Sequence, residues 1–300
     1  MHTSIGPLIA FLSSCTWALG STAYGRIARE ESAFAVNLSR GLVALPLFIL
    51  TAFSGGIQQG MMDFAHLSLA QWGWFSLSMV AGYGLGDTVF LWSARSLGVP
   101  TALSIASCYP LWTSAFGAIF QHEYLSFLQI LGLIFAVGGV VIVILSGSGD
   151  STGLKSNESR SFWKGLALAI FASLLWSMNS FSVNHAGRSV PMAVGNTIRM
   201  FMAVILCLSF SKILTPRLPV LLPRRFYRSY LWLFVVEAYG GSCCFFYGIA
   251  HSPLAVGAVL VSLAPVLAVP IGWAMGIEKF SIFRSLGTCV VVLGVCLLLL

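Results

Sequence analysis

Ten long apolar runs, separated by short polar segments, make up most of this 300-residue chain. A helix needs roughly 20 mostly apolar residues to cross a hydrocarbon layer about 30 Å thick, and each run comes close to that length. None of the runs alternates apolar and polar residues at period two, as the strands of a membrane barrel do. The pattern predicts an all-α polytopic membrane protein with ten transmembrane helices, over about residues 5–25, 33–53, 72–93, 101–120, 126–146, 164–184, 193–211, 230–250, 254–274 and 283–300.

The composition agrees with this prediction and excludes several other classes of protein. Apolar residues make up 58% of the chain and charged residues only 8%, against roughly 45–50% and about 25% in soluble domains. We therefore exclude a soluble enzyme, a disordered chain and a nucleic-acid-binding protein, and interpret the net charge of +7 as an orientation signal. The seven cysteines lie in apolar runs without a CxxC pair, and the five histidines form no ligand set, so we expect neither a metal nor a cofactor.

An internal repeat divides the chain into two halves. The one linker-like segment, residues 147–161, separates residues 1–146 from residues 162–300, and each half holds five predicted helices. Because five is odd, the second half enters the membrane from the opposite side, which gives the inverted repeat typical of secondary transporters. Identical residues coincide at a shift of 159 positions early in each half and 155 positions later: Ser14/Ser173, Trp17/Trp176, Ser21/Ser180, Asn37/Asn196, Arg40/Arg199, then Gly86/Gly241, Ser107/Ser262, Pro110/Pro265, Glu123/Glu278, Gly132/Gly287 and Gly139/Gly294.

The motifs that recur in both halves resemble those of EamA-domain transporters in the drug/metabolite transporter superfamily. Each half has a Trp in its first helix, an Arg early in its second, a small-residue run ending in Pro in its fourth, a Glu after that and a Gly-rich fifth helix. The resemblance covers essentially the whole chain and implies ten helices in two five-helix repeats, and a carrier, often an exporter, of metabolites or drugs. The residues that carry it are Trp17 and Trp176, Arg40 and Arg199, Pro110 and Pro265, and Glu123 and Glu278.

Basic residues are unevenly divided between the two faces of the predicted bundle. Loops that follow odd-numbered helices hold thirteen Lys and Arg, whereas the other loops hold only Arg188, once Arg40 and Arg199 within the predicted helices are set aside. Since basic loops tend to stay in the cytoplasm, we expect both termini outside, although members of the family are usually drawn with cytoplasmic termini. The short loops suit a bacterial inner membrane.

Four ionisable side chains fall inside the predicted helices, where charge is costly and marks a functional site by default. They are Arg40, Asp87, Arg199 and Glu237. At 1.5 Å per residue, Arg40, Asp87 and Glu237 share one depth, roughly 10 Å from the cytoplasmic side, and Arg199 lies about as deep from the opposite face. Two interpretations stay open. Either Asp87 or Glu237 binds an ammonium group or a coupling proton while the arginines meet a substrate carboxylate or phosphate, or Arg40 and one acid form an ion pair that only holds helices together.

Aromatic and polar side chains deep in the predicted helices are further candidates for substrate contact. Aromatic faces stack on apolar substrates or bind cations, and an amide hydrogen-bonds a ligand, although packing and helix–helix bonding are the commoner uses. The candidates are Trp17, Trp176, Tyr83, Tyr109, Tyr239 and Asn179.

Repeated Pro and Glu residues mark the fourth helix of each half and the turn after it. Pro110 and Pro265 free backbone carbonyl groups from helix hydrogen bonds, so we expect either gating kinks or static bends there. Glu123 and Glu278 are expected to cap the helix that follows or to bind loop groups.

Together these features favour a secondary active transporter, an exporter or exchanger of a small metabolite such as an amino acid. It would work by alternating access around a midplane cavity between the two repeats. The chain contains no GxxxxGK[ST] loop that would bind ATP. A channel-like protein, a non-transport membrane protein and an intramembrane enzyme are the alternatives. As partners we expect a small-molecule substrate, protons as a candidate coupling ion, and the lipid bilayer, with monomer and homodimer both left open.

Overall fold

All regular structure in the computed structural model is helical over the residues that it describes, which are 5–97, 99–145, 159–214, 216–264, 266–267 and 282–300. Four helices are long and apolar enough to cross a membrane: Ala33–Ala52, Ser161–Gly187, Met192–Leu214 and Arg224–Ala250. Three shorter apolar helices cover Ile5–Gly20, Phe127–Val143 and Ser285–Leu298. The predicted all-α membrane architecture is thus present in the described part of the chain.

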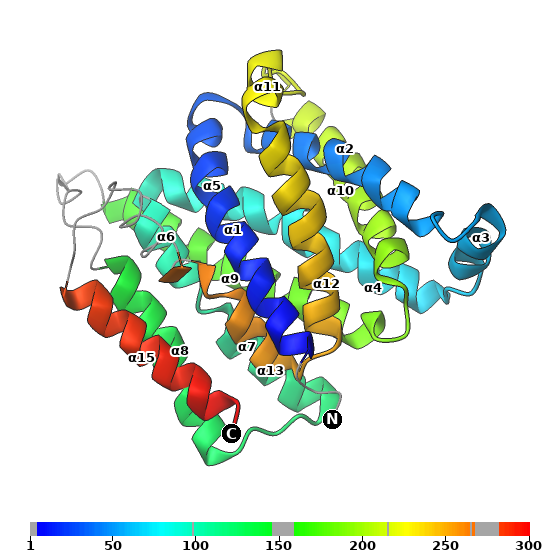
Figure 1. Ribbon diagram of the computed structural model, residues 1–300. Helices are drawn as coiled ribbons and strands as arrows, with labels where there is room; N and C mark the ends of the chain where they lie inside the picture. The colour runs from blue at the N-terminus through cyan, green and yellow to red at the C-terminus, as the bar shows by residue number, and fades with distance from the viewer. Residues whose placement is uncertain (1–4, 98, 146–158, 215, 265, 268–281) are drawn as a thin grey trace.

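The helices follow one another along the apolar runs (Figure 1). In the first half they are α1 (Ile5–Glu30), α2 (Ala33–Ala52), α3 (Ile57–Ala65), α4 (Leu69–Met79), the π-helical turn η1 (Val80–Gly84), α5 (Gly86–Leu97), α6 (Val99–Ala106), α7 (Tyr109–Phe116), the π-helical turn η2 (Gly117–Gln121) and α8 (Phe127–Leu145). In the second half they are α9 (Ser159–Gly187), α10 (Met192–Leu214), α11 (Arg224–Leu233), the π-helical segment η3 (Phe234–Gly241), α12 (Ser242–Ala250), α13 (Leu254–Val261) and α15 (Ile282–Leu298).

Four of the predicted helices are interrupted within the described residues. The run 72–93 forms α4 and α5 around η1, and the run 230–250 forms α11 and α12 around η3. The run 101–120 forms α6 and α7, which are separated at Ser107 and Cys108, and the run 254–274 is interrupted at Ser262 and Leu263, directly after α13. Hydropathy does not detect such breaks because the interrupted turns keep an apolar composition. π-Helical turns are frequent at functional sites, and irregular backbone is tolerated at membrane depth where it lines a cavity.

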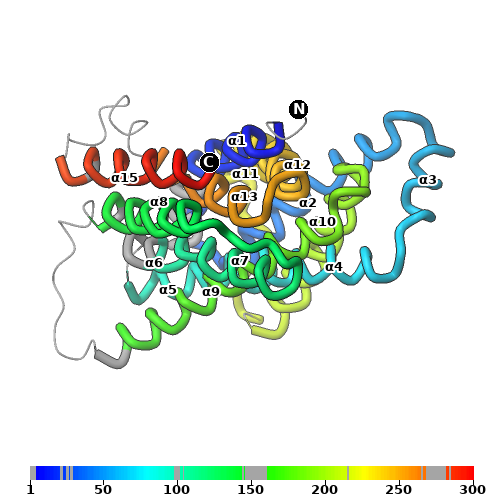
Figure 2. Tube along the Cα trace, turned by 90° about the horizontal axis from the view of Figure 1, so that it is seen from below, coloured from blue at the N-terminus to red at the C-terminus, as the bar shows by residue number. Residues whose placement is uncertain are grey.

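A further difference from the prediction is α3, which lies in the connection between α2 and α4 that we expected to be a loop. It projects from one side of the molecule in both views (Figures 1 and 2). Its side chains Ile57, Met61 and Met62 are exposed. The helix has only nine residues, too few for the hydropathy pattern to distinguish it from a loop.

Helices from the two halves of the chain pack against each other. α2 packs along α10, α5 along α9, and α1 along α12 and α13. α8 and α15 form a close pair at one edge of the molecule (Figures 1 and 2). Gly132 permits their close approach, since a Cβ added there would lie 2.7 Å from the carbonyl oxygen of Gly294. Small residues bring membrane helices together in this way.

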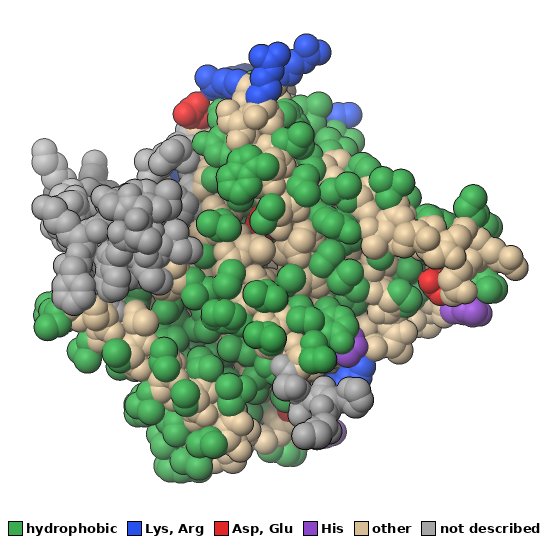
Figure 3. Space-filling view, viewed as in Figure 1, with side chains coloured by type: hydrophobic (Ala, Val, Ile, Leu, Met, Phe, Trp, Pro, Cys, Tyr) green, Lys and Arg blue, Asp and Glu red, His purple; other side chains and the backbone are tan. Residues whose placement is uncertain are grey.

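The surface is apolar over most of the face seen in Figure 3, as expected for contact with lipid. Lys and Arg side chains gather at the end of the molecule formed by α11, where Arg224, Arg225 and Arg228 are exposed. Arg225 donates a hydrogen bond of 3.0 Å to Glu30 at the end of α1. One end of the helix assembly therefore carries a cluster of positive charge.

Candidate functional site

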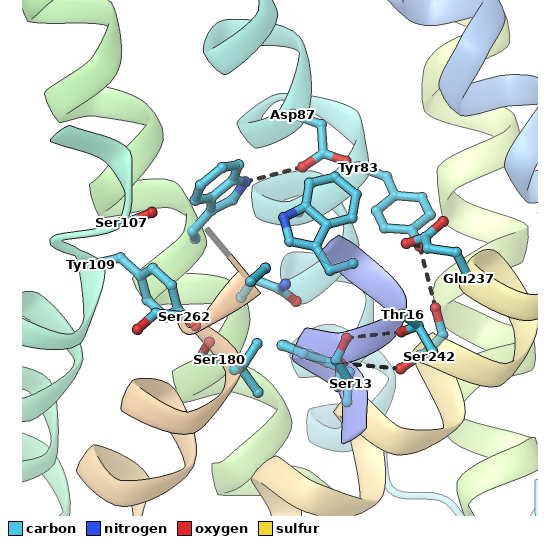
Figure 4. A pocket seen from close by; sticks show the side chains of 18 of the residues that line it. Ser13, Thr16, Tyr83, Asp87, Ser107, Tyr109, Ser180, Glu237, Ser242 and Ser262 are labelled. Carbon is cyan, nitrogen blue, oxygen red and sulfur yellow. Dashed lines mark hydrogen bonds between the residues drawn. The ribbon is translucent and has the colours of Figure 1, made fainter. Parts of the chain in front are cut away.

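A cavity of about 110 Å³ opens between the two halves (Figure 4). Its walls come from α1, α2, η1, α5, α6 and α7 of the first half and from α9, α10, η3, α12 and α13 of the second. Aromatic rings and a few convergent polar groups line it, as is typical of small-molecule sites. Asp87, Tyr83 and Glu237 lie together along one side of it, and Tyr109 and Ser262 lie opposite.

Arg40 of α2 is the centre of an ion-pair network at the cavity. Its guanidinium donates to both carboxylate oxygens of Glu237, from Nε at 3.2 Å and from Nη2 at 2.8 Å. Its Nη1 donates to Asp87 at 2.8 Å and to Asn37 at 2.9 Å. The three charged side chains are at most 10% exposed. The structure joins Arg40 to both acids, whereas the sequence left open a pair with only one of them.

Further donors hold the two carboxylates of this network. The Tyr24 hydroxyl of α1 donates to Glu237 at 2.7 Å, and the Trp176 indole N–H of α9 donates to Asp87 at 3.0 Å. Glu237 lies within η3 and Asp87 in the first turn of α5, directly after η1. One carboxylate therefore lies within a π-helical segment, and the other lies shortly after one. Buried charges need this degree of hydrogen bonding to offset the loss of water.

Aromatic rings enclose the guanidinium of Arg40. The Arg40 Cζ atom lies 3.9 Å from the ring centroid of Tyr83, 4.5 Å from that of Tyr24 and 5.3 Å from that of Trp17. All three distances fall within the roughly 6 Å at which a cation interacts favourably with a ring face. Arg40 is thus surrounded by carboxylate oxygens at its edges and by aromatic faces around it.

The formal charges of this network do not cancel. Asp87 and Glu237 carry two negative charges when ionised, and Arg40 carries one positive charge. One formal negative charge therefore remains beside the cavity, and an ammonium group or a proton would neutralise it.

Arg199 of α10 lines the same cavity but has different partners. Its Nε donates to the Ser78 hydroxyl at 2.9 Å, Nη1 to Asn196 at 2.6 Å and Nη2 to Asn179 at 3.2 Å. The side-chain ring of Phe245 lies 5.2 Å from its Cζ atom. Arg199 is only 2% exposed, and no acidic side chain within the described residues forms an ion pair with it. All of these partners are neutral.

The two arginines make matching contacts within their own halves. Each donates from Nη1 to the Asn three residues earlier in its helix, at 2.9 Å for Arg40 and 2.6 Å for Arg199. Each Asn in turn donates to a main-chain carbonyl group, that of Tyr83 at 3.0 Å in the first half and that of Ser242 at 3.2 Å in the second. The two arginines are 159 positions apart, as are the two Asn residues.

Each arginine also makes a contact with the opposite half. The Nε of Arg40 reaches Glu237 in the second half, and the Nε of Arg199 reaches Ser78 in the first. Arg40 therefore meets a carboxylate across the halves, and Arg199 meets a hydroxyl.

Most of the other sequence-predicted candidates reach the cavity. Its walls include Trp17, Tyr83, Tyr109, Trp176 and Asn179. The structure does not bring Tyr239 there: its hydroxyl lies 2.7 Å from that of Thr51, and its ring packs on Phe48 with centroids 4.7 Å apart. Two residues beyond Glu237 in η3, Tyr239 is directed to another side of the helix.

Pro110 lies at the interruption of its predicted helix, in the first turn of α7. Its side chain is buried, and it is absent from the described walls of the cavity. A Pro in the first turn of a helix leaves no backbone hydrogen bond unmade, so it marks the start of α7 rather than a bend within it. The repeated partner, Pro265, lies outside the described residues.

Glu123 caps a helix of the other half. Its Oε2 accepts a hydrogen bond of 2.9 Å from the backbone N–H of Leu254, the first residue of α13. We expected it to cap the helix that follows it, α8, but Ser126 takes that place by accepting from the backbone N–H of Gln129 at 3.3 Å. Glu278 lies outside the described residues.

Hydroxyl side chains are the cavity residues that the sequence did not single out. Ser13, Thr16 and Ser242 line the cavity, and Ser78 and Tyr24 bind its charged groups without having been predicted. Isolated hydroxyl residues are common in membrane helices and carry no signal of their own. Ser107, Ser180 and Ser262, which also line the cavity, are the exceptions, because the internal repeat identifies them.

The family of the chain is decided by a match over nearly its whole length. The model of the EamA-like transporter family matches residues 4–145 and again residues 163–300. The chain belongs to the EamA-like transporter family. This EamA-like protein is therefore an integral, multi-pass membrane protein and a transporter, as the sequence motifs predicted.

Two known proteins are similar to this EamA-like protein over almost their full lengths. An uncharacterized transporter of Archaeoglobus fulgidus is 24% identical over 293 residues, which cover 98% of this chain and 97% of the relative. A protein crystal structure matches with a TM-score of 0.78 and 16% sequence identity, over 98% of this chain and 96% of that one. At this identity, the likeness to the crystal structure supports the fold alone.

Proposed function

We propose that this EamA-like protein is a secondary active transporter, an exporter or exchanger of a small metabolite such as an amino acid. The substrate occupies the cavity between the two halves, and access to that cavity alternates between the two sides of the membrane. Asp87 and Glu237 bind an ammonium group or a coupling proton there, while aromatic side chains such as Trp17 and Trp176 contact the rest of the substrate.

The observation that carries this proposal is the position of the ion-pair network. Arg40 of the first half binds Glu237 of the second beside a cavity that both halves line. A buried ion pair that joins two halves changes its partners when the halves move apart. Protonation of a carboxylate or arrival of an ammonium group at this network would therefore be coupled to the relative position of the halves.

Matching contacts in the two halves support a mechanism based on an inverted repeat of ten helices, with residues 1–146 and 162–300 as five-helix repeats joined by the linker 147–161. Arg40 and Arg199 each bind an Asn in the same helix and a side chain of the opposite half. Two similar halves that exchange conformations move the opening of a central cavity from one side to the other.

Basic charge at the α11 end supports an orientation with both termini outside a bacterial inner membrane. A cysteine at Arg225 should then react with a membrane-impermeant maleimide only from the cytoplasmic side, in a variant without the native cysteines. Labelling from the outside in intact cells would contradict this orientation.

Counterflow in liposomes tests the proposed function. The purified protein is reconstituted into vesicles preloaded with one unlabelled amino acid or related metabolite at a time, and uptake of the labelled compound is followed. A secondary transporter gives saturable uptake that requires the preload. Flux that does not saturate and needs no preload would indicate a channel, and absence of flux from folded protein with every compound would overturn the proposal.

A further inference from the structure

Arg199 is a buried cation whose partners leave its charge uncompensated. It donates to Ser78, Asn196 and Asn179, and these three side chains are neutral. Asp87 and Glu237 both form ion pairs with Arg40 instead. An isolated buried charge is strongly unfavourable, so this arrangement calls for an anion that is not part of the described chain.

The partners of the two Nε atoms define the contrast between the arginines. Arg40 Nε binds the carboxylate of Glu237, and Arg199 Nε binds the hydroxyl of Ser78. A glutamate at position 78 would give Arg199 an internal counter-ion. The Ser hydroxyl accepts one hydrogen bond and leaves the positive charge of Arg199 in place.

The four buried charges therefore form two poles around one cavity. Arg40 with its two acids carries a formal charge of −1, and Arg199 carries +1. Both poles lie in the cavity wall. The charges add up to zero over the cavity as a whole, but they are separated in space, which suits a ligand that carries both signs of charge.

We infer that Arg199 is the anion-binding group of the cavity, with Ser78 behind it as a neutral hydrogen-bond acceptor, and that the transported metabolite carries a carboxylate which Arg199 binds. Arg40 is excluded from this role because its guanidinium already binds two carboxylates and lies between aromatic rings. The planar guanidinium of Arg199 suits a carboxylate. This inference rests on the proposed transport function and names the substrate class and the residue that selects it.

The test compares amino acids with their amides in the counterflow assay, since an amide keeps the side chain and the ammonium group but lacks the carboxylate charge. Wild-type protein should carry the acid with a KM at least about tenfold below that of its amide, because a hydrogen bond to a charged group contributes roughly 1.5–3 kcal/mol. Ser78→Glu and Arg199→Gln should lose this preference. Ser78→Ala, which removes the hydroxyl without adding charge, should keep it.

Equal KM values for acid and amide in wild-type protein would overturn the inference while leaving transport established. The inference is also overturned if Ser78→Glu still prefers the acid to its amide, in protein that unfolds at the same temperature as wild type. If no compound shows counterflow, the proposed function fails separately, and the subsite is then tested without transport.

That second test follows the melting temperature of the detergent-purified protein during titration with sodium acetate, at constant ionic strength with methanesulfonate, an anion that has no carboxylate. Acetate should raise the melting temperature saturably in wild type and in Ser78→Ala, and should have no such effect in Ser78→Glu. Acetamide, the neutral control, should have no effect on any of them. A wild-type protein that does not respond to acetate, or a Ser78→Glu variant that responds like wild type, would contradict an anion site at Arg199.

Discussion

Arg40 in α2 donates two hydrogen bonds, of 2.8 and 3.2 Å, to the carboxylate of Glu237 in η3, and so joins the two halves of the chain beside the cavity. The contact lies deep among apolar helices, where both side chains are almost fully buried. Its formation holds the halves together on this side of the cavity, and its rearrangement would accompany their movement.

Loss of the Arg40 charge should destabilise the protein strongly. Arg40→Gln leaves two buried carboxylates without their counter-ion, which typically costs about 3–5 kcal/mol. Thermal unfolding in detergent measures the effect. The double variant Arg40→Gln/Glu237→Gln should lose clearly less stability than the two single variants added together. Additive losses would show that the two side chains do not interact.

Two Tyr→Phe variants compare a tyrosine in the cavity wall with a tyrosine outside it. Tyr83 lines the cavity, and its hydroxyl lies 3.3 Å from that of Ser242, whereas the Tyr239 hydroxyl binds Thr51 away from the cavity. Tyr239→Phe loses one hydrogen bond, and Tyr83→Phe also loses a longer one of 3.5 Å to Glu237, each worth about 1 kcal/mol of stability. Only Tyr83→Phe should also raise the KM for counterflow. A larger rise for Tyr239→Phe would contradict this placement of the cavity.

The cap that Glu123 provides for α13 should contribute measurably to stability. Glu123→Ala removes the acceptor of the Leu254 N–H at 2.9 Å, and loss of such a cap costs about 1 kcal/mol. Glu123→Gln keeps an acceptor oxygen and should lose less, as measured by thermal unfolding. If the two variants unfold at the same temperature as wild type, the contact between the halves is not formed in the membrane protein.

The α8–α15 pair should tolerate no bulk at its contact. Gly132→Leu places a side chain against the backbone of α15, where a Cβ alone would come within 2.7 Å. Overpacking of this kind costs about 1–3 kcal/mol or more. Gly138→Leu on the same helix is the matched control, because nothing lies within 4 Å of a Cβ added there. Equal destabilisation by both variants would mean that α8 and α15 do not pack at Gly132.

The charged part of the site was predictable from the sequence because charge is rare in apolar helices. Arg40, Asp87, Arg199 and Glu237 stand out in their runs, and all four line the cavity. Counting residues from the helix ends even placed Arg40 at the depth of the two acids. The internal repeat added Trp17 and the Ser107/Ser262 pair.

The partners of these charges were not predictable in the same way, because they depend on the rotation of each helix and on where it is interrupted. Tyr24 binds Glu237 and Ser78 binds Arg199, yet neither residue differs in type from many others in the spans. Tyr239 lies two residues from Glu237 but is directed away from the cavity. The π-helical segment η3, which carries Glu237 and Tyr239, has no signature in the hydropathy pattern.

Counterflow by Glu237→Gln and Asp87→Asn tests most directly whether the Arg40 network takes part in transport. Both variants, shown to be folded, should exchange substrate at least about tenfold more slowly than wild type, since each loses a charged hydrogen-bond partner worth roughly 1.5–3 kcal/mol. Glu30→Gln, at the exposed ion pair with Arg225, should keep the wild-type rate. Wild-type exchange by both cavity variants would contradict the proposal and leave the network a structural contact between helices.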